Sequence, residues 1–395
     1  MKPRDYSRYP FIVIWEVTRA CALKCLHCRA EAQYRADPRQ LTTEQGKRLI
    51  DDIAALEEQP LFVFTGGDPL MRPDLFELAD YAIREKGLPV SMTPSATPKV
   101  TQAAIMQAKK VGLSRWAFSL DGSTAEIHDH FRGTRGSYDL TMRGIRFLQE
   151  ANIPIQINTT VSRYNLQDLD AISRKVKEMG VVLWSLFFLI PTGRAREKDM
   201  ITPEEHEQVM KWMVQLAHEM PYGVKSTEAP HYRRVMMQQR AAAEQQIKQR
   251  LAQSSEFNLG RHSEVELRPD TGRFSEDNAD QNAGSALSKH KDLLGRAPQG
   301  VNDGDGFVFI SHTGDVYPSG FLPVVCGNVK DESLMDVYRN SPVMQTLRDK
   351  SKLQGKCGVC EYKTMCGGSR ARAYAVTGDY MAGDPACAYI PAALR

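Results

Sequence analysis

The sequence predicts an α/β fold in which six strand–helix units form a partial barrel and a cysteine-rich extension follows. Short apolar runs with many β-branched residues alternate with amphipathic segments between Phe11 and about Met200. This alternation is typical of a parallel sheet covered by helices. After Cys357 the chain has few apolar residues and is rich in cysteine and glycine. Such a segment cannot form a large apolar core and needs another source of stability. Its clustered cysteines indicate that this source is a bound metal.

The predicted strands are the apolar runs Phe11–Trp15, Leu61–Thr65, Val90–Thr93, Arg115–Leu120, Ile153–Val161 and Val181–Ile190. Apolar residues three and four positions apart predict helices at Thr43–Leu56, Leu75–Lys86, Gln102–Val111, Tyr138–Glu150, Leu166–Met179 and Pro203–Met220. An open barrel of six units fits this pattern as well as a closed barrel of eight. We expect a partial (β/α)6, TIM-like barrel, whose chemistry would lie at the C-terminal ends of the strands.

Changes in composition divide the chain into four expected parts. These are an N-terminal tail, a barrel core, a polar insertion or linker and a cysteine-rich domain, at residues 1–10, 11–236, 237–300 and 301–395. Within the insertion, Gln238–Ser255 fits a solvated helix, whereas Ser263–Gly300 has the composition of a polar loop. Apolar residues return at Phe307–Ile310, and with the Gly-containing stretch that follows they predict a β-hairpin.

Charge and composition make some partners unfavourable. The formal net charge is +3 over 395 residues and no basic stripe is evident, so a nucleic-acid partner is not favoured. The apolar run Phe11–Trp15 is too short to span a membrane. Seven of the eight cysteines form two tight groups, with Cys326 apart, which in a reducing compartment indicates metal ligands before disulfides. We expect a cytoplasmic protein that binds neither nucleic acid nor membrane.

Three cysteines directly follow the first predicted strand. Cys21, Cys25 and Cys28 are separated by three and two residues. Three thiolates so close in sequence suit three irons of one 4Fe–4S cube and leave the fourth iron open. An open iron can bind and reduce a substrate, as an open position does in catalytic zinc sites. A zinc site with His27 as a fourth ligand is the alternative, although His27 lies between two of the cysteines and is constrained.

This motif resembles the signature of the radical S-adenosylmethionine (SAM) superfamily. The resemblance implies that SAM chelates the open iron and that an electron from the reduced cluster cleaves the SAM sulfonium. The resulting 5′-deoxyadenosyl radical would abstract hydrogen from a substrate, and Cys21, Cys25 and Cys28 would be the catalytic cluster ligands. An aromatic residue usually precedes the third cysteine, and here His27 takes that position.

Later strand ends resemble the SAM-binding motifs of the superfamily. Gly66-Gly67-Asp68-Pro69 is similar to a Gly-Gly-Glu-Pro motif whose acid receives the SAM ammonium, and paired glycines let a ligand approach the backbone closely. An ordinary Asp-Pro turn is the alternative. The other expected SAM contacts lie where the third, fourth and fifth strands end, at Ser95, Ser119, Asp121, Asn158 and Arg163. Taken singly, each is as consistent with a cap or turn residue.

A second group of thiols, Cys357, Cys360, Cys366 and Cys387, resembles the C-terminal SPASM extension of radical SAM enzymes, which holds auxiliary iron–sulfur clusters. Four thiolates fill every iron of a cube, so this cluster is expected to transfer electrons or stabilise the fold. A zinc ribbon is the alternative.

Further cysteines of the full SPASM pattern are missing. Ser319 stands where one is often found, and the stretch Gly367–Arg370 lacks another. We therefore expect two 4Fe–4S clusters, one that binds SAM and one auxiliary. Cys326 is expected to be a buried thiol, with a ligand of a degenerate cluster or a reactive residue as the alternatives.

The stretches Cys360–Tyr374, Gly378–Tyr380 and Asp384–Tyr389 are most similar to a subgroup of the superfamily. It contains the haem b synthase of the siroheme-dependent pathway, the haem d1 biosynthesis enzyme and the mycofactocin maturase. The first two alter propionates of iron tetrapyrroles, and the third modifies a short peptide. We expect a radical SAM oxidoreductase that decarboxylates or modifies iron-tetrapyrrole propionates, with flavodoxin or ferredoxin as electron donor. A peptide maturase and, from another class, an electron-transfer protein are the alternatives.

Arginine matches the geometry of a carboxylate, so arginines are the expected ligands of the substrate propionates. The candidates are Arg132, Arg135, Arg194, Arg370 and Arg372. The polar stretch around His128 and His130 is interpreted as a loop near the substrate, with its histidines in solvent.

Overall fold

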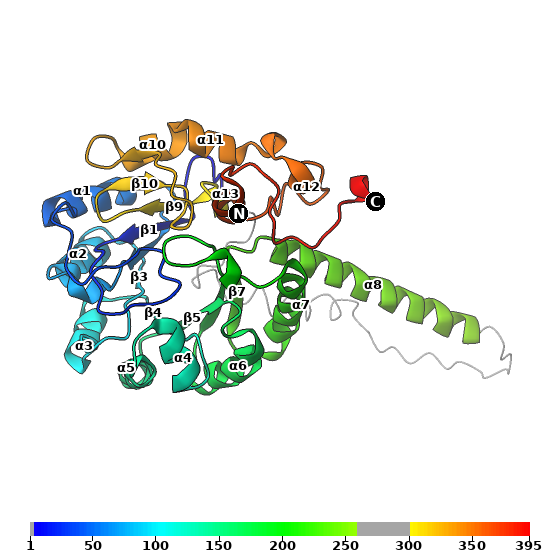
Figure 1. Ribbon diagram of the computed structural model, residues 1–395, viewed down its shortest axis with the longest axis horizontal. Helices are drawn as coiled ribbons and strands as arrows, with labels where there is room; N and C mark the ends of the chain where they lie inside the picture. The colour runs from blue at the N-terminus through cyan, green and yellow to red at the C-terminus, as the bar shows by residue number, and fades with distance from the viewer. Residues whose placement is uncertain (1–3, 259–300) are drawn as a thin grey trace, which may run out of the picture.

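One mainly parallel sheet organises the fold in the computed structural model, which describes residues 4–258 and 301–395. All six predicted strands are present, as β1 (Ile12–Glu16), β2 (Leu61–Thr65), β3 (Val90–Met92), β4 (Arg115–Ser119), β5 (Ile155–Val161) and β6 (Leu183–Phe188). They pair in this order and in parallel, so their C-terminal ends share one edge. Figure 1 shows the sheet curving, with helices around its outer side. The predicted partial barrel is confirmed.

The parallel sheet extends beyond the six predicted units. β7 (Gly223–Thr227) pairs in parallel with β6, and β9 (Gly306–Ile310) pairs in parallel with the other side of β1. Val224 is the one buried residue of β7, so this strand carries little of the apolar signal that marks the others. The structure corrects the six-unit core to seven consecutive parallel strands, extended by a strand of the C-terminal part.

Helices follow the strands close to the predicted bounds. They are α1 (Thr43–Ala54), α2 (Leu75–Asp80), α3 (Gln102–Val111), α5 (Ser137–Ala151), α6 (Leu169–Glu178) and α7 (Pro203–Glu219). A π-helical turn, Tyr81–Glu85, continues α2. Thr42 and Thr202 begin α1 and α7 with complete capping boxes, which satisfy backbone N–H groups that a helix start leaves free.

A further helix, α4 (Ala125–Arg132), replaces the loop expected after the fourth strand. The Thr124 side chain caps it by accepting from the Ile127 backbone N–H at 3.4 Å, and Gly133 ends it with φ 59°. His128 is 1 % exposed, which corrects the expectation that it lies in solvent, whereas His130 is exposed. Because polar residues dominate this stretch, its cap and its helical apolar spacing were overlooked.

The core lies between the sheet and the outer helices. Trp15, Trp116 and Trp184, on β1, β4 and β6, are fully buried. Gly46 allows α1 to lie against Trp15, because a Cβ at this position would be 2.6 Å from the indole ring. This packing fixes the strands whose C-terminal ends carry the candidate site.

The C-terminal part begins with strands and continues with short helices, namely β8 (Asn302–Asp303), β9, β10 (Asp315–Tyr317), β11 (Gly327–Asn328), α10 (Leu334–Asn340), α11 (Pro342–Arg348), α12 (Gly355–Gly358) and α13 (Arg370–Thr377). β9 and β10 pair antiparallel, so the predicted hairpin is confirmed.

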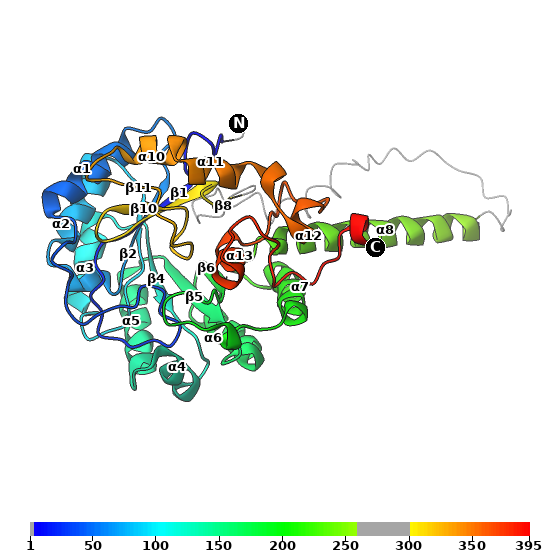
Figure 2. The ribbon, with the colours of Figure 1, turned by 45° about the horizontal axis from the view of Figure 1, so that its top comes forward.

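The start of α13 bridges the two sides of the open barrel. Ser369 Oγ donates to Glu228 Oε2 at 2.8 Å, just after β7, and the Ala371 N–H donates to Asp303 Oδ2 of β8 at 3.0 Å. Figure 2 shows α13 between the β8–β9 side and the β6–β7 side. The C-terminal part therefore closes the opening that the parallel strands leave.

α8 (His231–Asn258) starts beside the barrel and extends as a long arm (Figure 1). It includes the helix predicted at Gln238–Ser255, and residues 240–250 are exposed. The polar loop predicted at Ser263–Gly300 lies outside the described residues. Among the described helices, none combines the length and apolar character needed to cross a membrane.

Candidate active site

The first three cysteines lie on the loop that follows β1. Cys21 and Cys25 are buried and Cys28 is half-buried, all as free thiols. The backbone N–H of Leu23 donates to Cys21 Sγ at 3.4 Å, and that of Ala32 donates to Cys28 Sγ at 3.5 Å. Burial raises the pKa of the Cys25 thiol to about 11. Thiolate there needs a cation partner, which cluster iron supplies.

The loop after β6 holds this cysteine loop by its backbone. Arg194 Nε donates to the Cys25 carbonyl at 2.9 Å, and the Arg194 N–H donates to the Cys28 carbonyl at 3.1 Å. Gly193 has φ 60°, and a Cβ there would be 2.4 Å from the Cys28 carbonyl oxygen. Arg194, expected to bind a substrate carboxylate, thus holds the cysteine loop through Nε and its backbone N–H, while its buried Nη2 has no hydrogen-bond partner among the described residues.

His27 packs inside the loop as an aromatic ring. It stacks on Phe131 of α4 with the centroids 4.1 Å apart and the planes at 22°. Burial and the positive charge of Arg132 lower the pKa of His27 well below its ordinary value, so the ring is neutral at pH 7. His27 thus packs as the aromatic residue usual at this position would.

The Gly-Gly-Asp motif and Ser95 meet the cysteine loop at the strand ends. The Gly67 N–H donates to the Thr18 carbonyl at 2.8 Å and the Asp68 N–H to the Ala20 carbonyl at 2.7 Å. Ser95 Oγ donates to the Gly67 carbonyl at 3.0 Å and lies 3.6 Å from Cys21 Sγ. The structure therefore brings these predicted residues beside a cluster ligand.

Gly66 and Gly67 leave no room for a side chain against this loop. A Cβ at Gly66 would be 2.5 Å from the Thr18 carbonyl oxygen, and one at Gly67 would be 2.4 Å from that of Ala20. Their lack of a Cβ serves close contact between two backbone segments. The paired glycines were expected instead to let a ligand approach the backbone closely.

Gly67→Ala is expected to displace the cysteine loop and to lower the iron bound by the reconstituted protein, because the new Cβ meets backbone rather than a mobile side chain. Iron per chain and the absorbance of the cluster measure this. Gly180→Ala is the control for backbone strain alone, since it places alanine at φ 63° with no atom within 4 Å of the added Cβ, and it should keep the wild-type iron content. Equal iron in all three proteins would contradict the prediction.

Asp68 is fully buried and is bonded within its own segment. Its Oδ1 accepts from the Leu70 N–H at 3.2 Å, and its Oδ2 accepts from Thr97 Oγ1 at 2.8 Å. Burial raises the pKa of Asp68 to about 6. Both oxygens of Asp68 thus accept a hydrogen bond within the protein, and a SAM ammonium would share them. The SAM contact of Asp68 stays a prediction.

Asp121 links three elements at the ends of β4 and β5. Its Oδ1 accepts from the Thr160 N–H at 2.7 Å, and its Oδ2 lies 3.3 Å from Arg132 Nη1. Although burial opposes the charge of Arg132, the thiol of Cys25 and then Asp121 raise the pKa of this arginine. Arg132 is therefore a buried cation beside the cysteine loop, a role that sequence reasoning did not assign.

The remaining predicted SAM contacts lie farther along the strand ends. Ser119 and Asn158 are partners across the β4–β5 pair, and Asn158 Oδ1 accepts from Gln156 Nε2 at 2.6 Å. Arg163 is exposed, and its Nε donates to the Met200 carbonyl at 2.8 Å. In this arrangement Arg163 is held by the loop after β6, and the SAM contacts of all three residues stay predictions.

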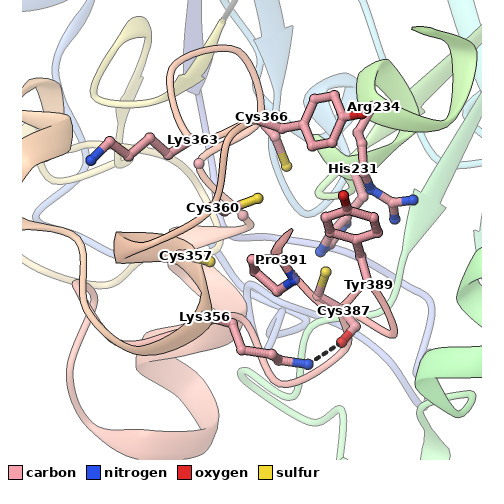
Figure 3. A pocket seen from close by; sticks show the side chains of 13 residues that line it. His231, Arg234, Lys356, Cys357, Cys360, Lys363, Cys366, Cys387, Tyr389 and Pro391 are labelled. Atoms are coloured by element: carbon pink, nitrogen blue, oxygen red, sulfur yellow. Dashed lines mark hydrogen bonds between the residues drawn. The ribbon is translucent and has the colours of Figure 1, made fainter. Parts of the chain in front are cut away.

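The second group of thiols lines one pocket, shown in Figure 3. Cys357, Cys360, Cys366 and Cys387 surround it, together with the basic side chains of His231, Arg234, Lys356 and Lys363. Across the described residues, no three His, Cys, Asp or Glu side chains converge on a single-ion position. Basic groups around four thiols suit a cluster that is an anion.

Cys326 does not line that pocket. It is half-buried on the connection from β10 to β11, and its Sγ donates to the Val324 carbonyl at 3.6 Å. The structure thus places Cys326 at a half-buried position, and the expectation of a buried thiol stays a prediction.

Comparisons with known proteins agree with this geometry. The family model of the radical SAM superfamily matches residues 15–176, and that of an iron–sulfur cluster-binding domain, SPASM, matches residues 303–361. An AdoMet-dependent heme synthase of Methanosarcina barkeri is 36% identical and covers 97% of each chain. An Fe-coproporphyrin III synthase of the same organism is 30% identical over 95% of this chain and 87% of its own.

A solved structure shares the fold. Streptococcus suis SuiB bound to the precursor peptide SuiA has a TM-score of 0.66 at 15% sequence identity, covering 97% of this chain and 76% of that one. At this identity the likeness concerns the fold alone.

A partial barrel with a three-cysteine loop and a four-cysteine extension defines an iron–sulfur enzyme. This chain belongs to the radical SAM superfamily. It binds SAM and a 4Fe–4S cluster in the barrel, and an additional iron–sulfur cluster in the SPASM domain. It is an enzyme that cleaves SAM reductively to a 5′-deoxyadenosyl radical, so the plain electron-carrier alternative is set aside.

Proposed function

We propose that this enzyme decarboxylates propionate side chains of an iron tetrapyrrole, in the manner of a haem-forming synthase. The relatives named as heme synthases support this substrate class. The structural observation that carries it is a cavity of about 550 Å³ beside the cysteine loop. Pockets for small molecules and cofactors span roughly 300–1,000 Å³, and this cavity falls within that range.

The cavity lies where β1 and β9 end, next to the third cysteine. Arg29 and Ala30, which directly follow Cys28, form part of its wall, and Phe309 and Tyr317 of the β9–β10 hairpin form another part. A hydrogen atom must be removed close to the radical source, so a substrate cavity has to border the cluster loop. Tyr317 is half-buried in this wall, whereas Phe309 is 4 % exposed and lies under the Arg29 guanidinium at 4.5 Å, so a flat macrocycle would meet Tyr317 and Arg29.

Cations of the cavity lining replace the arginines expected from sequence. Arg19, Arg29, Arg39 and Lys330 line it, and each of the three arginines also has a carboxylate partner in the chain. An incoming propionate would use guanidinium donors that these pairs leave over, since arginine has five N–H donors. Each arginine could therefore bind a propionate while it keeps its ion pair with a carboxylate of the protein.

Four of the five arginines that sequence reasoning assigned to propionates are held inside the protein. Arg194 bonds the cysteine loop, Arg132 pairs with Asp121, and Arg370 and Arg372 are 1 % and 0 % exposed. Their spacing in the sequence resembled a carboxylate site, but each is fixed by carbonyls, a thiol or a buried acid. The cavity arginines are therefore the better candidates.

The chemistry balances with groups that the enzyme supplies. A propionate that loses a hydrogen atom to the deoxyadenosyl radical, then carbon dioxide and one electron, becomes a vinyl group. The bound SAM cluster provides the radical, and the auxiliary cluster is the natural acceptor for the electron. We propose Cys21, Cys25 and Cys28 for the first cluster, and Cys357, Cys360, Cys366 and Cys387 for one auxiliary 4Fe–4S cluster.

Several finer assignments are part of the same proposal. Eight residues are proposed to surround SAM, because they lie at the strand ends of the barrel. They are Gly66, Gly67, Asp68, Ser95, Ser119, Asp121, Asn158 and Arg163. The four-part division at residues 10, 236 and 300 is likewise proposed, and so is an external donor such as flavodoxin or ferredoxin, which must reduce the SAM cluster.

Equilibrium binding tests the substrate class. Anaerobic protein titrated with iron coproporphyrin III should give a saturable change in the Soret band, whereas short peptides ending in aromatic residues should not compete with it. Tight peptide binding without tetrapyrrole binding would favour the peptide-maturase alternative and contradict the proposal.

Arg29→Met is expected to weaken iron coproporphyrin binding about tenfold, equivalent to about 1.4 kcal/mol. The substitution removes the guanidinium that lies 4.5 Å above Phe309 and 2.8 Å from Glu16 while keeping a long side chain. Arg135→Met is the control, because Arg135 is exposed and does not line the cavity. Equal dissociation constants for wild type and Arg29→Met, at equal iron content, would remove Arg29 from the site.

A further inference from the structure

We propose that Arg370 raises the reduction potential of the auxiliary cluster by donating a hydrogen bond to the sulfur of Cys357. This inference rests on the proposed assignment of the four thiols to that cluster, and it goes beyond the reaction proposed above. Arg370 Nη2 lies 3.6 Å from Cys357 Sγ, within the range of N–H···S bonds. Sequence reasoning had placed this arginine at a substrate carboxylate.

Arg370 is a buried cation that has no carboxylate within ion-pair distance among the described residues. It is 1 % exposed. Its Nη1 donates to the carbonyls of Tyr380 and Ala382 at 2.9 and 2.7 Å. Carbonyl dipoles fix the guanidinium but do not neutralise it, and burying an unpaired charge is costly. The carboxylates of Asp303 and Asp384 interact with Arg370 only from beyond ion-pair distance. A cube held by four thiolates is an anion in both oxidation states, and it would place a counter-charge in direct contact with Arg370.

The backbone beside Cys357 is shaped for this contact. Gly368 has φ 69°, and a Cβ there would be 2.5 Å from Arg370 Nη2 and 3.0 Å from Cys357 Sγ. The Asp384 N–H donates to the same sulfur at 3.4 Å. Cys357 thus accepts two hydrogen bonds, and glycine is the residue that lets the guanidinium and the sulfur approach each other.

Arg370 differs from its neighbour Arg372, which is also fully buried. Arg372 Nη1 pairs with Asp384 Oδ2 at 3.1 Å, so its charge is neutralised within the protein. Of the basic residues that line the pocket, His231 pairs with Asp384 and Arg234 with Glu207. Lys356 and Lys363 donate to carbonyls. Arg370 adds a directed donor that stays charged at every accessible pH.

A donor to a ligand sulfur favours the more negative, reduced cluster. Reduction adds one electron to an already anionic group inside a protected pocket, where charges interact more strongly than in water. Hydrogen bonds to the cluster sulfurs and charges nearby are known to shift the reduction potentials of clusters. A higher potential makes the auxiliary cluster a better acceptor of the electron released when a propionate loses carbon dioxide.

A redox titration of full-length protein tests this inference. Cys21, Cys25 and Cys28 are replaced by alanine, so the EPR signal of the reduced protein reports the auxiliary cluster. Added to this background, Arg370→Gln should make reduction about tenfold less favourable, which is a potential about 59 mV lower for a one-electron couple. Arg370→Lys keeps the positive charge but lacks the planar guanidinium. Its midpoint potential should lie between that of the parent protein and that of Arg370→Gln.

Arg348→Gln is the matched control. Arg348 also bonds two carbonyls, those of Gly304 at 2.9 Å and Tyr338 at 2.7 Å, and within the described part of the chain it has no hydrogen bond to a thiol. Its substitution should leave the midpoint potential unchanged. An unshifted potential in Arg370→Gln would overturn the proposal, as would loss of the cluster from both Arg370 variants, which would indicate a role in assembly. If the protein with the three alanine substitutions and an unchanged Arg370 gave no EPR signal, the assignment of the four thiols to a cluster would itself be overturned. These readouts need no tetrapyrrole, so they are independent of the substrate.

Discussion

Cys25→Ser is expected to reduce the formation of 5′-deoxyadenosine from SAM by at least about a thousandfold, or about 4 kcal/mol of activation free energy. Cys25 is 7 % exposed, and its loop is fixed by Arg194 through the Cys25 carbonyl. Serine preserves the size of the side chain but is a poor iron ligand, so the SAM cluster should be lost while the fold is kept. Chromatography of the nucleoside after dithionite reduction measures the effect.

Cys326→Ser provides the matched control for that experiment. Cys326 is also a partly buried thiol, but its sulfur bonds a carbonyl at 3.6 Å and it does not line the four-cysteine pocket. This variant should keep the wild-type rate and iron content. A Cys25→Ser protein that still forms the nucleoside at the wild-type rate would show that the cysteine loop is not the site of SAM cleavage.

Arg372→Met is expected to destabilise the protein by about 3 kcal/mol, because it leaves the buried Asp384 with one cation, His231 at 3.0 Å, in place of two. Asp384 is 1 % exposed and Arg372 is 0 % exposed. The guanidinium also donates to the Glu228 carbonyl at 2.6 Å, so the same side chain ties α13 to the end of β7. The loss should appear as a fall of about 5 °C in the melting temperature of the anaerobic holoprotein.

Arg240→Met measures what an arginine contributes when its ion pair is exposed. Arg240 pairs with Glu244 along α8, with side chains 83% and 57% exposed, and such surface pairs contribute little. Its melting temperature should match wild type. If Arg372→Met melted at the same temperature as Arg240→Met, the α13 bridge across the barrel opening would not be a stabilising contact.

The barrel could be predicted from sequence because its signals are local. Each of the six predicted strands carries several apolar residues, and the helices between them have capped starts such as Thr42. β7 could not be found in this way, since its neighbours β6 and α7 decide its conformation and Val224 is its one buried residue. The pairing of β9 with β1 is a contact between residues nearly three hundred positions apart, which no local pattern encodes.

In the candidate site, too, the features with a local signal could be predicted from sequence and those that depend on long-range contacts could not. Ligand types and spacing identified the two groups of thiols, because cysteine has few other reasons to cluster in a reducing compartment. The roles of the arginines were not accessible, since a guanidinium serves equally as a carboxylate ligand, a carbonyl clamp or a buried counter-charge. Arg194 and Arg370 take the second and third of these roles, which only the fold reveals.

The most direct test of the whole account is a single anaerobic turnover experiment. Reconstituted protein is mixed with SAM, a low-potential reductant and iron coproporphyrin III, and both products are followed by mass spectrometry. The account predicts one 5′-deoxyadenosine for each propionate converted, and a tetrapyrrole lighter by one carbon dioxide and two hydrogen atoms at each step. Formation of 5′-deoxyadenosine with an unchanged tetrapyrrole would contradict the proposed substrate, and absence of both products from protein with intact clusters would contradict the account as a whole.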